Sequence, residues 1–123
     1  MDIAIFSNSS NGEFNKPYVF DNLENIFLSL GISKKNIGID FAVNSIFKKN
    51  KIIFFRVKEE DVSTEDYFFG FDYLKNEILS LDAIFIPNVG SSHIIEASLK
   101  ICNIFKSILI INQNDFYDFL TNH

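Results

Sequence analysis

The chain of 123 residues has no tryptophan, one cysteine, two prolines and five glycines. Because Cys102 has no second thiol to pair with, an intramolecular disulfide and a thiolate metal site are both excluded. We expect Cys102 to be a core residue on the apolar side of a helix. No apolar run approaches the roughly eighteen residues that cross a bilayer, and the first residues do not resemble a secretory signal. These absences predict a soluble, cytoplasmic protein that does not act in a membrane.

Positive charge is also scarce, since 11 Lys and Arg residues face 16 Asp and Glu residues, for a net charge of −5. Proteins that bind nucleic acid usually present a basic face, so this balance disfavours a nucleic-acid partner and favours a basic protein. Solubility alone is the other explanation of an acidic chain. The two histidines, His93 and His123, give no credible metal site, and no glycine-rich phosphate-binding motif is present. We therefore expect neither a metal nor a cofactor.

Hydrophobic residues make up 47% of the chain and include 15 phenylalanines, which is enough for one domain, residues 1–123, with one sizeable core. Short apolar runs without alternation lie at residues 2–6, 52–57, 82–87 and 107–111. Such runs are typical of strands covered on both faces, and therefore of a parallel sheet joined by helices. They predict four strands.

Helical spacing connects these strands. It predicts a helix from Pro17 to Leu30 closed by Gly31, and a short second one over residues 40–49 with Asp40 as its N-cap. Further helices are predicted at residues 64–81 and 94–105 and, capped by Asn114, at the end of the chain. The predicted fold class is α/β: a three-layer sandwich with a four-stranded, mostly parallel sheet of order 2-1-3-4, Rossmann-like or flavodoxin-like.

This topology predicts where a ligand would bind. In open parallel sheets, ligands lie beyond the carboxyl ends of the strands where the winding direction reverses, here between the loops at residues 7–12 and 88–93. The second loop leads into a helix, whose free N–H groups suit an anion such as a phosphate. Serines at a helix start are equally explained as caps. The candidate ligand-binding residues are Asn8, Ser9, Asn88, Ser91, Ser92 and His93.

Glu96 is the candidate catalytic carboxylate, one turn after Ser92. The run at residues 82–87, Gly90-Ser91-Ser92, Ile95-Glu96-Ala97 and the run at residues 105–110 together resemble the closing half of the nucleoside 2-deoxyribosyltransferase-like superfamily, over residues 82–112. The resemblance implies a Rossmann-like domain that binds a nucleoside and uses Glu96 at a glycosidic bond. A plainer role for Glu96 is to stabilise the helix dipole.

A second candidate surface is acidic and aromatic. Successive helix residues are about 100° apart, so one face cannot bury all the rings of residues 67–73. Exposed rings beside carboxylates suit a protein-binding surface, although a second neighbouring element would bury them. The candidate partner-binding residues are Glu59, Glu60, Asp61, Asp66, Tyr67, Phe69 and Tyr73.

Two functions follow from these features. In the first, the chain is a small non-catalytic binding protein that occludes a basic protein, as an immunity or antitoxin protein does with a nuclease toxin. In the second, it is a nucleotide- or nucleoside-binding enzyme that acts at a glycosidic bond through Glu96. The position of Glu96 relative to the loop at residues 7–10 discriminates between the two functions.

Overall fold

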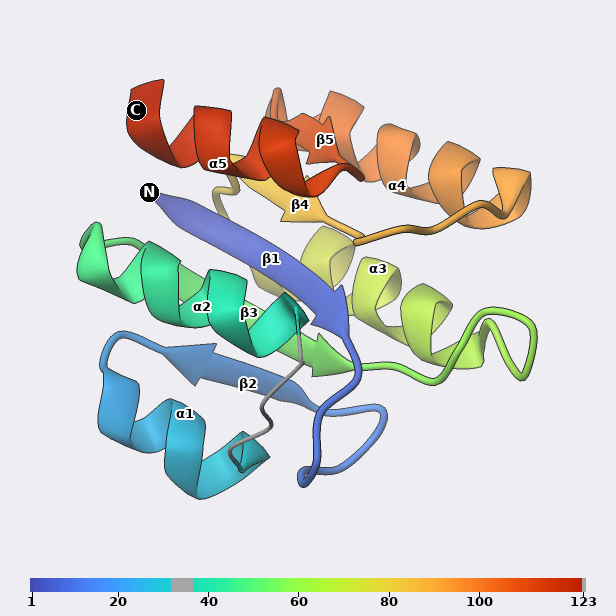
Figure 1. The fold of residues 1–123 in the computed structure, drawn as a ribbon. Helices are drawn as coiled ribbons and strands as arrows, with labels where there is room; N and C mark the ends of the chain where they lie inside the picture. The colour runs from blue at the N-terminus through green and yellow to red at the C-terminus, as the bar shows by residue number, and fades with distance from the viewer. Residues whose placement is uncertain (32–36, 123) are drawn as a thin grey trace.

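The computed structural model describes residues 1–31 and 37–122 (Figure 1). The strands within these residues are β1 (Asp2–Ser7), β2 (Pro17–Phe20), β3 (Lys51–Arg56), β4 (Ala83–Phe85) and β5 (Ile108–Ile110). The helices are α1 (Leu23–Leu30), α2 (Ile37–Phe47), α3 (Glu65–Glu77), α4 (Ser92–Phe105) and α5 (Gln113–Asn122). The predicted α/β class is confirmed.

The strands form one five-stranded mixed sheet of order β2-β3-β1-β4-β5. The pairs β1–β3, β1–β4 and β4–β5 are parallel, whereas β2 pairs antiparallel with β3. The prediction of a four-stranded, mostly parallel sheet is therefore wrong in strand number and in sheet type, although the four predicted strands lie in their predicted relative order, as β3-β1-β4-β5. The difference comes from β2, which adds to the edge of the sheet beside β3.

The segment that forms β2 was predicted to be the start of a helix. Pro17 is instead the first residue of an edge strand, a position where its missing N–H costs no ladder hydrogen bond. The helix α1 starts only after Asn22, whose side chain accepts a hydrogen bond from the N–H of Asn25 at 3.0 Å. Its predicted end is confirmed, because Gly31 has φ 78° and donates to the carbonyl of Phe27. The apolar spacing of Val19 and Phe20 fits a strand as well as a helix.

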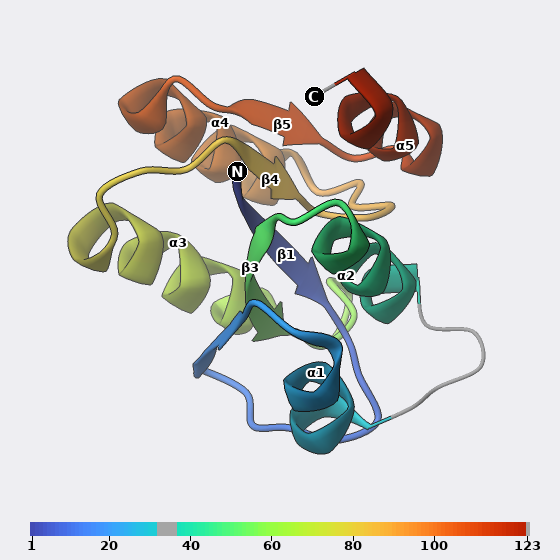
Figure 2. The same cartoon turned by 90° about the vertical axis from the view of Figure 1, so that its left-hand side faces the viewer.

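Two hydrophobic clusters cover the two faces of the sheet, because successive strand residues point to opposite sides. Ile3 and Ile5 of β1 pack with α1, α2 and α5, whereas Ala4 and Phe6 pack with α3 and α4. Figure 2 shows the result, with α3 and α4 on one side of the strands and α2 and α5 on the other. The predicted sandwich is confirmed at this level, and Cys102 is buried in the α3–α4 cluster, where burial raises the pKa of its thiol.

Helix boundaries correct two smaller predictions. Asp40 lies in the first turn of α2 and is not its N-cap, because α2 begins at Ile37. The cap of α5 is Asn112, not Asn114: its Oδ1 accepts from the N–H of Asn114 at 2.7 Å.

The helix α3 lies unusually close to β1 at Gly70. A Cβ built on Gly70 would lie 2.8 Å from Cζ of Phe6, closer still to Cε2 of the same ring, and 3.1 Å from Cγ of Phe55. The Phe6 ring is itself fixed by Phe55 and Phe71, with ring centroids 4.8 and 4.9 Å away. Glycine at position 70 therefore permits a close approach of helix and sheet.

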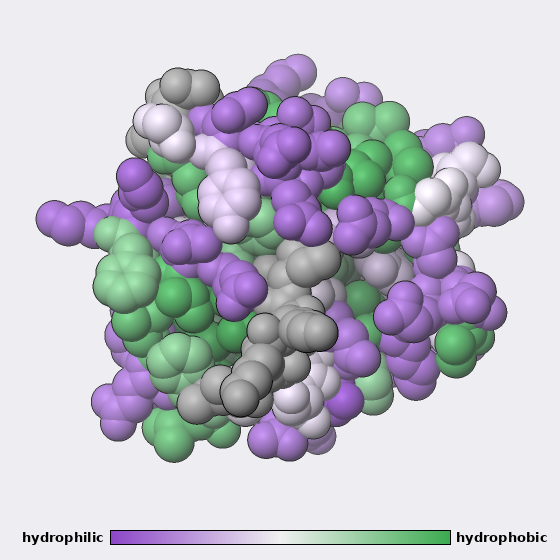
Figure 3. Space-filling view, in the orientation of Figure 1, coloured by the Kyte–Doolittle hydropathy of each residue, from purple (hydrophilic) through white to green (hydrophobic). Residues whose placement is uncertain are grey.

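The face of the molecule formed by α1 and α2 is partly apolar. Figure 3 shows hydrophobic side chains gathered at the lower left, over α1 and α2, whereas the rest of this face mixes polar side chains with smaller hydrophobic groups. Exposed apolar side chains on these two helices are Phe27, Leu28 and Phe47, of which Leu28 is 74% exposed.

Candidate binding site at the carboxyl ends of the strands

A pocket of about 250 Å³ lies where the carboxyl ends of β1, β3 and β4 meet. Its walls come from residues 6–8 at the end of β1, residues 57–60 after β3, residues 87–88 after β4, and Tyr67 of α3. This is the edge of the sheet at which the sequence places a ligand. The loop after β3, which was not among the two predicted loops, also contributes.

The predicted ligand-binding residues are divided between different places. Asn8 and Asn88 line the pocket. Ser9 is buried under its own loop and donates from Oγ to the carbonyl of Asn11 at 2.6 Å. Ser91 is the N-cap of α4, since its Oγ accepts from the N–H of Ile94 at 3.4 Å.

Ser92 and His93 are exposed at the start of α4, and His93 lines a different groove. This groove of about 310 Å³ runs between α3 and α4, and Glu96 lines it together with Lys75 and Lys100. Glu96 is exposed, and it is not among the described residues that line the pocket at the strand ends. The predicted proximity of Glu96 to the loop at residues 7–10 is therefore not found.

The N–H of Gly90, at the turn before α4, already has an anionic partner within the chain. Both carboxylate oxygens of Glu60 accept from this N–H, Oε1 at 3.1 Å and Oε2 at 3.0 Å. A carboxylate from the loop after β3 thus occupies a position that the sequence suggested for a phosphate or carboxylate ligand.

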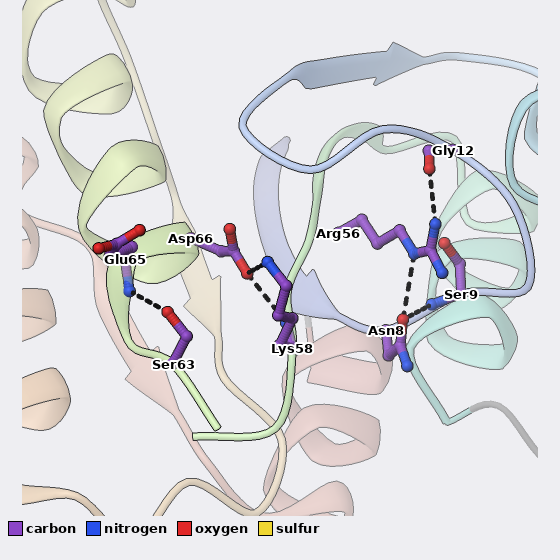
Figure 4. Close-up of polar contacts among 8 residues, drawn as sticks. All are labelled: Asn8, Ser9, Gly12, Arg56, Lys58, Ser63, Glu65 and Asp66. Atoms are coloured by element: carbon purple, nitrogen blue, oxygen red, sulfur yellow. Dashed lines mark hydrogen bonds and ion pairs between the residues drawn. The ribbon is translucent and has the colours of Figure 1, made fainter. Parts of the chain in front are cut away.

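Two cations beside the pocket are engaged by neighbouring groups (Figure 4). Lys58 directs its ammonium group to Oδ2 of Asp66 at 3.3 Å, and its backbone N–H donates to the same oxygen at 3.1 Å. Arg56 donates to Oδ1 of Asn8 at 3.1 Å and to the carbonyl of Gly12 at 2.6 Å. Both cations also lie against the ring of Phe14. Their charges are therefore directed towards the protein itself.

The candidate partner-binding residues also divide. Glu59 and Asp61 are exposed on the loop after β3, and Phe69 is 36% exposed on α3. Asp66 and Tyr67 are only 2% and 5% exposed, so the structure corrects their expected place on a contact surface. The physical reason is that α3 packs directly on β1 and β3, which buries the side of its first turn that carries these two residues.

Glu60 and Tyr73 of the candidate set are half-buried, Glu60 on Gly90 and Tyr73 against Phe55. The sequence reasoning missed Val62, which is 70% exposed, and it left Phe68, which is 38% exposed, out of the candidate residues although it counted this ring among those of residues 67–73. Both residues lie within or beside the acidic segment of the sequence, and this position could have indicated that they belong to the same surface.

Tyr67 forms the inner wall of the pocket. Its ring stacks on Phe6, with centroids 5.8 Å apart and an angle of 11° between the planes. Its hydroxyl has no hydrogen-bond partner among residues 1–31 and 37–122. Burial raises the pKa of Tyr67 well above its usual value, and the negative charges of Glu60, Glu59 and Asp66 raise it further.

Within the described parts of the chain, no group of three or more His, Cys, Asp or Glu side chains is arranged to hold a metal ion. The helices there include none with the length and apolar character to cross a membrane.

Comparisons with protein-family models, with curated proteins and with solved structures find no match to this chain. The resemblance of residues 82–112 to the nucleoside 2-deoxyribosyltransferase-like superfamily therefore depends on the quoted motifs alone.

Proposed function

We propose that this chain is a non-catalytic binding protein that occludes a basic protein partner with the surface at the carboxyl ends of its strands. We define this surface, the acidic edge, as the solvent-accessible side chains of residues 57–69. A nuclease toxin is the class of partner that fits best, because an enzyme that binds nucleic acid presents a basic site. The chain would then act as an immunity or antitoxin protein.

The observation that carries this proposal is an imbalance of available charge. The carboxylates of Glu59 and Asp61 are exposed and have no side-chain partner in the described part of the chain. The nearby cations, Arg56 and Lys58, are directed to Asn8, Gly12 and Asp66. The acidic edge thus keeps negative charge available to a partner, which speeds encounter with a basic surface and selects against acidic ones.

Apolar groups beside these charges supply contact area. Val62 lies in the same loop, and Phe68 and Phe69 follow on the first turns of α3, all at least 36% exposed. Aromatic residues next to charged ones are typical of the residues that contribute most to protein–protein binding. The acidic edge therefore combines steering charge with apolar contacts.

The alternative, an enzyme acting at a glycosidic bond, has less support. Its candidate carboxylate, Glu96, lies in the groove between α3 and α4, and the N–H of Gly90 is bound to Glu60. A nucleoside in the pocket would meet neither its proposed catalyst nor an open anion site.

The test is affinity capture from the native cell with the wild-type chain and with a Glu59→Lys, Asp61→Lys double variant. We expect the wild type to capture one basic protein in stoichiometric amount, which the purified chain binds again and, for a nuclease, inhibits. The double variant should lose at least tenfold in affinity, because two attractive charges become repulsive.

The matched control is a Glu24→Lys, Asp118→Lys variant. These two residues are exposed on α1 and α5, and each substitution adds two positive charges, so both variants change the net charge from −5 to −1. The control should bind almost as the wild type does. Equal binding by all three proteins, or capture of an acidic partner, would reject the proposed function.

A further inference from the structure

The pocket at the strand ends is lined by a tyrosine whose hydroxyl the fold leaves unpaired. Tyr67 is 5% exposed, lines the pocket, and has no hydrogen-bond partner for its hydroxyl among the described residues. Among the described residues the fully buried side-chain polar atom without a partner is Oγ of Ser107, so the Tyr67 hydroxyl reaches solvent at the pocket, where water or a ligand can pair with it. Its place in the pocket wall makes this hydroxyl available to an incoming group.

The charge around the pocket selects the kind of group. Glu59 and Glu60 both line the pocket, and the charge of the third ionised lining residue, Lys58, is balanced by the ion pair with Asp66 at 3.3 Å. The pocket therefore has an excess of negative charge. An anion would be repelled by these carboxylates. It would also find no free donor at Gly90, because that N–H is already bound to Glu60.

The shape and the other lining groups favour a planar cation over a compact one. Tyr67 and Phe6 are stacked rings that both line the pocket, and a guanidinium group packs well against aromatic faces. A guanidinium carries five N–H donors, which can be shared between carboxylates and a hydroxyl oxygen. A lysine ammonium has three donors and is more strongly hydrated, so it gains less from such a site.

We propose that this pocket binds the guanidinium group of an arginine side chain presented by the protein partner. This inference depends on the proposed function and specifies the residue by which the partner is recognised. The carboxylates of Glu59 and Glu60 and the hydroxyl of Tyr67 accept hydrogen bonds from the bound group.

The first experiment uses N-acetyl-arginine amide as the probe and the uncharged N-acetyl-citrulline amide as its control, in a titration followed by amide NMR shifts. Arginine amide should shift the amides of residues 57–60, 67 and 88–90, and citrulline amide should not. Glu59→Gln should weaken arginine binding about tenfold, because it removes the negative charge and replaces one acceptor oxygen with an amide donor, and Tyr67→Phe should weaken it about two- to tenfold, because it removes the hydroxyl acceptor.

Glu65→Gln is the matched control, because Glu65 is an exposed carboxylate on the same segment outside the pocket lining. It should bind arginine amide as the wild type does. Equal shifts with citrulline amide, shifts confined to other surfaces, or no shifts at all would overturn the inference. The melting temperature of Tyr67→Phe verifies that the variant is folded.

The second experiment measures the affinity of the captured partner for the wild type and for the same variants. If the partner binds wild type, Tyr67→Phe and Glu59→Gln equally, the arginine pocket is wrong while the binding function stands. If arginine amide binds but no basic protein is captured, the occupant is a free guanidinium compound, and both the inference and the proposed function are wrong. Weaker binding of the partner to Tyr67→Phe and Glu59→Gln, with unchanged binding to Glu65→Gln, supports the inference.

Discussion

The carboxylate of Glu60 binds the backbone N–H of Gly90 through both oxygens, at 3.1 and 3.0 Å, across 30 residues of sequence. This contact connects the loop after β3 to the turn that precedes α4. It also explains why the small residues before α4 do not form an open phosphate site: the anion that they bind comes from the chain itself.

Removal of this carboxylate should release the turn before α4. In Glu60→Ala we expect amide hydrogen exchange at Gly90 to become at least about tenfold faster, because its N–H loses a charged acceptor. NMR-detected exchange measures the rate directly. Glu59→Ala, which changes the adjacent carboxylate, should leave exchange at Gly90 as it is in the wild type; equal acceleration in both variants would contradict the role of Glu60.

The close approach of α3 to β1 makes position 70 intolerant of a side chain. Gly70→Ala should destabilise the protein by about 1–3 kcal/mol, since the added methyl group would collide with the buried ring of Phe6, despite the better helix propensity of alanine. Urea unfolding measures the change. At Gly90 an added Cβ would lie 3.6 Å from Oε1 of Glu60, so Gly90→Ala should cost less than about 0.5 kcal/mol. Equal stability of the two variants would show that helix and sheet separate easily.

Asp66 is a buried acceptor for both the backbone and the side chain of Lys58. Asp66→Ala should cost about 1–3 kcal/mol in the free energy of unfolding, chiefly because the N–H of Lys58 loses its acceptor. Lys58 itself is 43% exposed, so water solvates its released charge. The neighbouring exposed carboxylate provides the comparison: Glu65→Ala should change stability by less than about 0.5 kcal/mol. A loss below that limit for Asp66→Ala would mean that this pair is structurally unimportant.

Tyr67 should make stability sensitive to alkaline pH. Burial raises the pKa of Tyr67 in the folded state, so above the usual tyrosine pKa of about 10 the unfolded chain loses this proton first. The unfolded state then binds fewer protons, and the free energy of unfolding falls as pH rises above 10. Urea unfolding at increasing pH should show this fall in the wild type and a smaller one in Tyr67→Phe. Identical pH dependence would place the Tyr67 hydroxyl in water.

Parts of this fold can be predicted from the sequence, because there the local preference of the residues agrees with the packing of the whole sheet. The apolar runs of β1, β3, β4 and β5 contain enough β-branched and aromatic residues to be strands in any packing, and Ser91 caps α4 as its position predicts. The β2 segment is different. Tyr18, Val19 and Phe20 fit a helical face and a strand equally well, and the sheet edge beside β3 decides between them.

The site was harder to predict than the fold. The topology indicates the correct edge of the sheet, but not which side chains turn towards it. Glu60 lies in the loop after β3 and Glu96 lies in α4 after β4, and only the packing of the chain brings the first into the pocket and leaves the second outside. The burial of Tyr67 likewise depends on Gly70, whose lack of a side chain lets α3 approach β1.

The most direct test of the account is hydrogen exchange of the chain with and without its captured basic partner, followed by mass spectrometry. We predict slower exchange in the complex over residues 57–69 and 87–91, at the acidic edge and the turn that Glu60 connects to it. Protection over the apolar face of α1 and α2, with residues 57–69 unchanged, would contradict the account.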